Sequence, residues 1–243
     1  MWFDVFVFMT AIVAAGVAAI TGFGIGSLLT PTLGLAVGTK VAVAAVSVPH
    51  LIGTAIRFWM LRDAVDRRVL WRFGLASAAG GLTGAWLHGR AGSPWLTGVF
   101  GVLLLFVAAS ELTGLARRMR FHGVVAWIAG ALSGLLGGLV GNQGGIRSAA
   151  LLGFDLSKRT FVGTATAVGL VVDAARMPVY LTTVGAEVTA IWPVVLVATA
   201  GVVLGTLFGG RVLARIPERM FRPIVAGILA ALGIAMLAQG MRS

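Results

Sequence analysis

The sequence has 243 residues, of which 58% are hydrophobic and only 11% are charged, and its mean hydropathy is +0.99. Charged residues make up roughly a quarter of an ordinary globular sequence, so this composition excludes a soluble domain and indicates an integral membrane protein. The net charge of +11 comes from Lys and Arg in short segments between apolar runs, which follows the positive-inside rule and argues against nucleic acid as a partner.

Ten apolar runs follow one another along the chain, and each is predicted to be a membrane-embedded helix. They lie at about 3–20, 22–37, 41–61, 69–88, 95–115, 122–140, 142–154, 160–183, 189–213 and 221–240. A helix needs about 20 residues to cross the hydrocarbon core, and only the runs at 22–37 and 142–154 are clearly shorter. Each short run follows a glycine-rich break, so each is predicted to be the return arm of a hairpin whose tip stays inside the membrane.

The two breaks occupy matching positions, because Gly22 and Gly141 lie 119 residues apart. The first break is Gly22-Phe23-Gly24-Ile25-Gly26-Ser27, and the second is Gly141-Asn142-Gln143-Gly144-Gly145-Ile146-Arg147. Non-helical backbone within a membrane is tolerated only where protein or a water-filled cavity surrounds it. Two interrupted apolar segments at corresponding positions of two halves point to the binding site of a secondary transporter.

Other residues repeat at almost the same offset. Gly34 matches Gly153, Lys40 matches Arg159 and Arg57 matches Arg176 at 119 residues, while the pair Gly80 and Gly84 matches Gly201 and Gly205 at 121. We assign these last glycines to close helix packing. Five elements in each half is an odd number, so the second half should be inserted upside down. The predicted fold is therefore an all-α polytopic membrane protein with two inverted repeats, residues 1–116 and 121–243, of about five helical elements each.

The basic residues predict the orientation of the chain in the membrane. Alternate loops lie on the same side of the membrane if every run crosses it, and also if each hairpin returns to the side from which it entered. One side then receives most of the basic residues: Arg62, Arg67, Arg68, Arg72, Arg117, Arg118, Arg120, Lys158, Arg159, Arg211, Arg215, Arg219 and Arg222. The other side receives Lys40, Arg90 and Arg242 together with Asp4 and Glu187. The first side should be cytoplasmic, which places both termini outside the cytoplasm.

The sequence resembles the TauE/SafE family, the sulfite exporters that are also called toluene sulfonate uptake permeases. The resemblance rests on the Gly-x-Gly-x-Gly break at Gly22–Gly26, on Pro31 five residues later, on the second glycine-rich break and on the basic loops, and it covers essentially the whole chain. It implies transport of sulfite, organosulfonates or related small organic anions across a bacterial inner membrane.

Two polar stripes accompany the breaks. Ser47, His50, Thr54 and Arg57 share one face of the third run, and Thr166, Gly169, Asp173 and Arg176 repeat their spacing in the eighth. A polar stripe on a membrane helix faces the protein interior or a wet path, because lipid cannot hydrate it. Each stripe either lines the path of a substrate or only joins helices by hydrogen bonds.

The ionisable residues of the stripes each allow two interpretations. Arg57 either binds a ligand or extends to the headgroups at the end of its run. Asp173 and Arg176 form an i,i+3 ion pair, or Asp173 carries a coupling proton. His50 is a proton acceptor or a hydrogen-bonded packing residue.

Arg147 is the strongest candidate for ligand binding. It falls in the first turn of the short run after Gly144-Gly145, where unpaired N–H groups and a partial positive charge attract anions. The first arm of each hairpin ends at the same tip with a partial negative charge, so the helix dipoles alone do not favour an anion. The side chains of Arg147, Asn142 and Gln143 do favour one. The alternative is that Arg147 pairs with a carbonyl or a lipid phosphate.

We therefore predict a secondary carrier that binds a small anion between the two tips and transports it by alternating access. The predicted substrate-binding residues are Asn142, Gln143, Arg147, Gly24, Gly26, Ser27, Gly144, Gly145, Ser47, His50, Arg57, Thr166 and Arg176, with Asp173 and His50 as candidates for proton coupling. The expected partners are the anion and the lipid bilayer, with no cofactor, metal or nucleic acid. Proton coupling and homo-oligomerisation are left open.

Two other classes of function fit the sequence less well. An anion channel or uncoupled pore is the first alternative, although no ring of repeated charge is present. An intramembrane enzyme is less favoured, because the sequence has neither a His-Glu-x-x-His zinc motif nor a Gly-x-Ser-x-Gly elbow, and it has only three histidines. An ATP-driven pump would need a phosphate-binding loop that is also missing.

Overall fold

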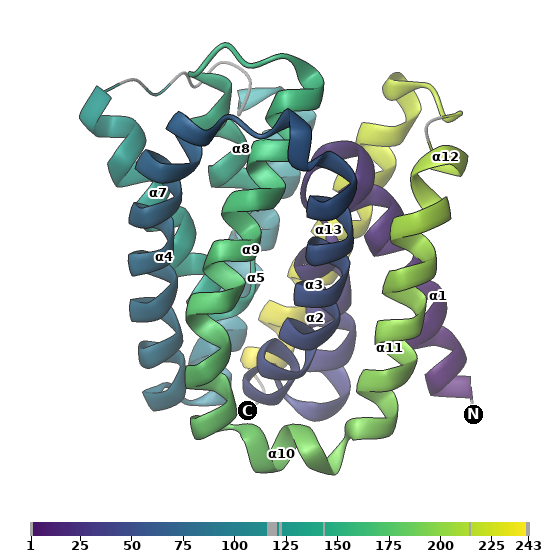
Figure 1. Cartoon of the computed structure of the whole chain (residues 1–243). Helices are drawn as coiled ribbons and strands as arrows, with labels where there is room; N and C mark the ends of the chain where they lie inside the picture. The colour runs from purple at the N-terminus through teal and green to yellow at the C-terminus, as the bar shows by residue number, and fades with distance from the viewer. Residues whose placement is uncertain (1, 116–120, 122, 143, 214, 242–243) are drawn as a thin grey trace.

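A computed structural model describes residues 2–115, 121, 123–142, 144–213 and 215–241, and these residues form helices and connecting turns without a β-strand (Figure 1). The helices are α1 (Trp2–Thr21), α2 (Ile25–Val37), α3 (Thr39–Leu61), η1 (Arg62–Ala64), α4 (Arg67–Arg90), α5 (Ser93–Thr113), α7 (Gly123–Val140), α8 (Gly144–Leu152), α9 (Lys158–Thr183), α10 (Gly185–Ala190), α11 (Trp192–Leu204), η2 (Gly205–Gly209), α12 (Gly210–Leu213) and α13 (Glu218–Gly240). The predicted all-α fold is confirmed.

Seven of the described helical segments are long and apolar enough to cross a membrane. They are Trp2–Thr21, Thr39–Ala64, Ser93–Thr113, Gly123–Val140, Lys158–Thr183, Trp192–Gly209 and Arg219–Gly240. Helix α4 is equally long but is not among them, because glycine, serine and basic residues dilute its apolar side chains. It still exposes Leu75, Leu82 and Trp86 on its outer face. The polytopic membrane protein predicted from composition is therefore confirmed.

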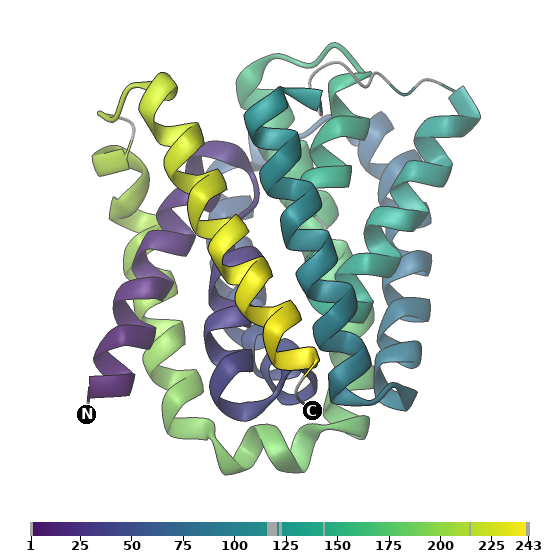
Figure 2. The same ribbon diagram turned by 180° about the vertical axis from the view of Figure 1, so that it is seen from behind.

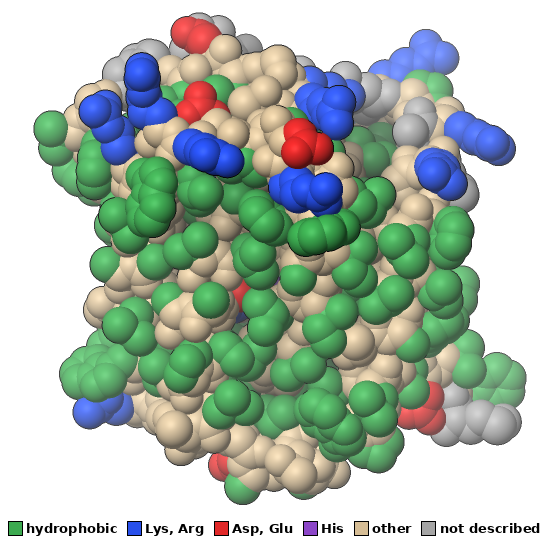
Figure 3. Space-filling view, in the orientation of Figure 1, with side chains coloured by type: hydrophobic (Ala, Val, Ile, Leu, Met, Phe, Trp, Pro, Cys, Tyr) green, Lys and Arg blue, Asp and Glu red, His purple; other side chains and the backbone are tan. Residues whose placement is uncertain are grey.

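Charged side chains gather at the two ends of the helical bundle. Lys and Arg side chains concentrate at the upper end in Figure 3, and apolar side chains cover the middle of this face. Both termini and α10 lie at the lower end (Figures 1 and 2). Residues Arg117, Arg118, Arg120 and Arg242 lie outside the described part of the chain.

Two helical hairpins are formed by α1 with α2 and by α7 with α8. Helix α1 begins at the lower end of the molecule, whereas α7 begins at the upper end (Figure 1). The return arms are short, since α2 has 13 residues and α8 has 9. The chain reverses at Gly24, with φ of 144°, and at Gly141, with φ of 74°, both in the region that favours glycine. The predicted hairpins with short return arms are present.

Packing between the two halves is reciprocal. Helix α4 of the first half packs on α7 of the second, and α11 of the second half packs on α1 of the first. Helices α3 and α9 pack on each other, as do α5 and α13. The corresponding elements of a two-fold repeat would make these exchanged contacts. The bundle is therefore held together mainly across the two halves rather than within each one.

The α4–α7 interface brings two backbones into contact. A Cβ atom on Gly80 or Gly84 would overlap a carbonyl oxygen of α7, and one on Gly134 or Gly138 would overlap a carbonyl oxygen of α4. Small residues at such crossings let membrane helices approach closely. On the other side of the bundle, Cβ atoms on Gly201 and Gly205 would collide with the backbone of α1. The assignment of these glycines to packing is confirmed.

We expect Gly84→Ala to destabilise the protein by about 1–3 kcal/mol, because the added methyl group would force α4 away from the Leu135 carbonyl of α7. The matched control is Gly227→Ala in α13, where a methyl group meets nothing within 4 Å and should be neutral or stabilise the helix by up to about 1 kcal/mol. Unfolding midpoints of both variants in detergent measure the difference. Equal midpoints would contradict the packing described here.

An arginine stacks on a tryptophan at each end of the bundle. The Arg62 guanidinium lies 4.2 Å from the ring centroid of Trp59, where α3 ends, and the Arg90 guanidinium lies 3.5 Å from that of Trp86, in the last turns of α4. Both rings are at least half exposed. Tryptophan favours the membrane–water interface, and the paired arginine reaches the headgroups. The two pairs therefore indicate where the bilayer begins and ends.

Candidate functional site

The two hairpin tips contact each other inside the bundle. The Ser27 hydroxyl, in the first turn of α2, donates a 3.1 Å hydrogen bond to Asn142 Oδ1 in the second break. A Cβ atom on Gly26 would overlap the carbonyl oxygen of Gly141, and one on Gly144 would overlap the Phe23 side chain. The breaks, 119 residues apart in sequence, thus pack backbone to backbone.

Arg147 lies at this junction. It is the fourth residue of α8, is only 3% exposed, and donates a 3.0 Å hydrogen bond from Nη2 to the carbonyl of Gly22 in the opposite tip. Its Nε and Nη1, like Nδ2 of Asn142, have no partner among the described residues. The pairing with a carbonyl that the sequence left as an alternative therefore occurs, but it uses only one of the three guanidinium nitrogens.

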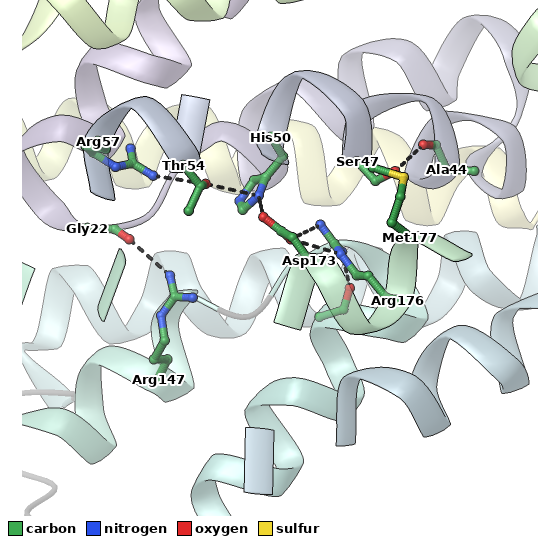
Figure 4. A network of polar contacts seen from close by, with 11 residues as sticks. Gly22, Ala44, Ser47, His50, Thr54, Arg57, Arg147, Asp173, Arg176 and Met177 are labelled. Atoms are coloured by element: carbon green, nitrogen blue, oxygen red, sulfur yellow. Dashed lines mark hydrogen bonds and ion pairs between the residues drawn. The ribbon is translucent and has the colours of Figure 1, made fainter. Parts of the chain in front are cut away.

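Arg57 supplies a second buried guanidinium from α3. It is 5% exposed, so it does not extend to the headgroups, and its Nη2 lies 3.4 Å from Thr54 Oγ1. Its Nε and Nη1 find no partner in the described part of the chain. Figure 4 shows Arg57, Thr54 and His50 in a row along α3, with Arg147 pointing toward that row from α8.

Gly169 of α9 makes room for this arrangement. A methyl group there would lie 2.9 Å from Arg147 Nη1 and 3.6 Å from Thr54 Cγ2. The position corresponds to His50 in the first half, so the two stripes have different side chains at equivalent places. The missing side chain lets the Arg147 guanidinium lie between α9 and Thr54.

Asp173 joins the two polar stripes. Its Oδ1 accepts a 3.0 Å hydrogen bond from Nε of Arg176 and forms an ion pair with Nη2 at 2.8 Å, and its Oδ2 lies 2.6 Å from Nδ1 of His50 (Figure 4). Asp173 and Arg176 are both essentially inaccessible to solvent. The i,i+3 ion pair expected within α9 is confirmed. The bond to His50 was not predicted, because the sequence did not show which residues of the two stripes face each other.

The carbonyl groups at the end of α7 are occupied by side chains from neighbouring helices. Arg176 donates to the Gly137 carbonyl, Tyr180 donates to that of Gly138, and a ring nitrogen of His88 lies 2.8 Å from that of Leu139. The last carbonyls of a helix have no partner within the helix and carry its partial negative charge. Arg176 also brings a positive charge to this end of α7, which offsets part of the helix's negative charge beside the second tip.

Several other predicted site residues can also be placed. The Ser47 hydroxyl donates to the carbonyl of Ala44 on its own helix, whereas Oγ1 of Thr166 is buried without a described partner. Gly24 immediately precedes α2, Gly145 belongs to the first turn of α8, and Gln143 lies outside the described residues. Sequence reasoning missed Tyr180, although its place one turn after Arg176 on a polar stripe was a usable signal.

The buried charges do not balance. Among the buried side chains of the described residues, Arg57, Arg147 and Arg176 carry positive charge and only Asp173 carries negative charge. An uncompensated charge away from water is costly, and buried charges are normally paired. Since Asp173 is bound to Arg176, the guanidinium groups of Arg57 and Arg147 have no described counter-ion. The site has the charge and the free N–H donors to hold an anion.

Comparison with known families agrees with this chemistry. A family model described as sulfite exporter TauE/SafE matches residues 7–236, nearly the whole chain. The chain belongs to the TauE/SafE sulfite exporter family. Both hairpin tips and both stripes fall within the match, and TauE/SafE membership indicates a membrane transporter of sulfur-containing anions rather than an enzyme. Comparisons with curated proteins and with solved structures gave no match.

Proposed function

We propose that this TauE/SafE protein is a secondary carrier for a small oxyanion, such as sulfite, an organosulfonate or a related organic anion. The anion binds between the hairpin tips, where Arg147 and Arg57 supply charge and Asn142 supplies an amide N–H. Backbone N–H groups at the starts of α2 and α8 complete the site, since the first N–H groups of a helix lack partners within it. Arginine suits this ligand because its planar fork matches the oxygens of sulfonates and carboxylates.

One observation carries the proposal: two deeply buried guanidinium groups with unpaired N–H donors lie beside two interrupted helices. Nε and Nη1 of both Arg57 and Arg147 are buried and lack a partner among the described residues. Nearly all buried polar groups in proteins are hydrogen-bonded, so such atoms indicate a missing ligand or water. Water could satisfy the hydrogen bonds, but it would leave both positive charges uncompensated.

The two halves, residues 1–116 and 121–243, are proposed to be inverted repeats that alternate access by tilting one hairpin-containing unit against the other. The hairpins that begin at opposite ends and the reciprocal α4–α7 and α1–α11 contacts support this symmetry. The basic end of the bundle is assigned to the cytoplasm of a bacterial inner membrane, which leaves both termini outside the cytoplasm.

The function is tested with the purified full chain in two steps. Unfolding midpoints are first measured with sulfite, sulfate, methanesulfonate and small carboxylates, and a bound anion should raise the midpoint in a concentration-dependent way. Uptake of the stabilising anion into proteoliposomes should then saturate and should show counterflow. Non-saturating conductance without counterflow would establish the channel alternative, and the absence of stabilisation by every anion would refute the proposed site.

A further inference from the structure

We propose that His50 is a proton-binding site linked to the anion site, so that each anion crosses the membrane together with a proton. The inference rests on the proposed carrier function and adds the coupling ion to it. It is carried by the contacts of His50, the only described side chain that joins the Asp173–Arg176 pair of α9 to the α3 row of Thr54 and Arg57.

The hydrogen bond to Asp173 fixes the tautomer of His50. A carboxylate only accepts hydrogen bonds, so Nδ1, 2.6 Å from Asp173 Oδ2, must carry a proton. In the neutral ring Nε2 then bears the lone pair, and no described residue makes a hydrogen bond to it. The side chain of His50 is 10% exposed, whereas that of Asp173 is fully buried. The ring is thus oriented to accept a proton on Nε2, while Asp173 stabilises the imidazolium that forms.

The groups around His50 make this protonation depend on the anion. Arg57 lies near it on its own helix, and Arg176 lies beside Asp173 on α9 (Figure 4). Arg147 of α8 lies farther away, next to Gly169 and Thr54, and Asp173 is the one acid among the buried described residues. In the empty site three guanidinium charges oppose a fourth positive charge on His50, and only one carboxylate favours it. A bound anion compensates the charges of Arg57 and Arg147, which leaves the attraction of Asp173 to favour the proton.

Binding of the two ligands is therefore mutually reinforcing. If the anion increases protonation of His50, protonation must increase affinity for the anion by the same factor. Affinity should rise as pH falls, by at most about tenfold for each pH unit for one linked proton. The proton taken up with the anion on one side is released with it on the other.

The test uses isothermal titration calorimetry of the full chain in two buffers with different ionisation enthalpies. The probes are sulfite and methanesulfonate, of which the second keeps its charge around neutral pH. His50→Gln is the test variant, because its amide still donates to Asp173 but cannot take up a proton. His88→Gln is the matched control, since it removes another buried histidine that contacts backbone carbonyls rather than the site.

Wild type and His88→Gln are expected to take up protons on binding. His50→Gln should bind the anion more weakly, with no proton uptake and no pH dependence of affinity, because it stays in the unprotonated, lower-affinity state. Comparison of variants removes the contribution of sulfite's own ionisation. Proton uptake that persists in His50→Gln, or anion binding to wild type without proton uptake, would overturn the inference but leave the carrier intact. Failure of wild type to bind either probe would overturn both proposals.

A second measurement does not depend on the folding of any variant. Wild-type proteoliposomes that contain a pH-sensitive dye should acidify internally when an inward gradient of methanesulfonate or sulfate is applied. Anion uptake without acidification would contradict proton coupling.

Discussion

Arg147→Ala is expected to abolish anion binding while the protein remains folded in detergent. Removing one partner of a buried charge pair costs about 2–5 kcal/mol of binding free energy, which corresponds to a roughly 30-fold or greater loss of affinity. The loss of affinity should lie near the upper limit of this range, because Arg147 belongs to α8 and also contacts the opposite tip through the Gly22 carbonyl. Binding is measured by calorimetry or by the shift of the unfolding midpoint with added anion.

Removal of the Arg147 guanidinium should not destabilise the ligand-free protein. Two of the three guanidinium nitrogens of Arg147 have no described partner, so its buried charge is a net cost when no anion is present. Arg147→Met, which keeps most of the volume, should therefore raise the ligand-free unfolding midpoint while it eliminates the shift caused by the anion. Arg62→Ala, which removes an exposed arginine stacked on Trp59, is the control and should leave binding unchanged. Wild-type affinity in Arg147→Ala would remove this residue from the site.

Asp173→Ala is expected to have the largest effect on stability, about 3–5 kcal/mol of unfolding free energy, because it leaves the buried guanidinium of Arg176 without its carboxylate. The double variant Asp173→Ala, Arg176→Met should recover part of this loss, since it removes the isolated charge as well. Recovery should remain incomplete, because Arg176 also donates to the Gly137 carbonyl at the end of α7.

The control for this pair is Asp63→Ala, which removes an exposed carboxylate from η1 and should change the unfolding midpoint little. All four proteins are compared by thermal unfolding in the same detergent without ligand. If the single Asp173 variant unfolds at the wild-type midpoint, Arg176 does not depend on this carboxylate, and the ion pair is not a structural element of α9.

The sequence was sufficient to predict the hairpins, because run length and glycine position are local properties. The runs at 22–37 and 142–154 were too short to span, and both proved to be return arms beginning at glycine breaks. The single helix predicted from the run at 189–213 was less accurate, because the structure divides this range among α10, α11, η2 and α12. The π-helical turn at Gly205–Gly209 gave no signal in the hydropathy pattern, since an extra residue per turn does not change composition.

The site was predictable only in part. The breaks pointed to Arg147 and Asn142, and the structure buries both where the two tips meet. Their role in binding an anion stays a prediction. Spacing also placed His50 and Asp173 on their stripes, but it could not show that they meet. Their contact joins residues 123 positions apart and depends on how α3 and α9 are rotated against each other. For the same reason, spacing could not show that Arg176 is engaged by Asp173 and Gly137.

The stacked pairs Trp59–Arg62 and Trp86–Arg90 have a consequence for the lipid around the protein. They lie at opposite ends of the helical bundle, in which the 24 residues of α4 span about 36 Å. Acyl chains that are much shorter or longer cannot be accommodated by sliding the protein along the membrane normal, because one ring would leave its interface. The bilayer must instead become thinner or thicker around the protein, or the whole molecule must tilt relative to the membrane normal. Acyl-chain length is thereby coupled to the inclination of the helices that form the proposed anion site.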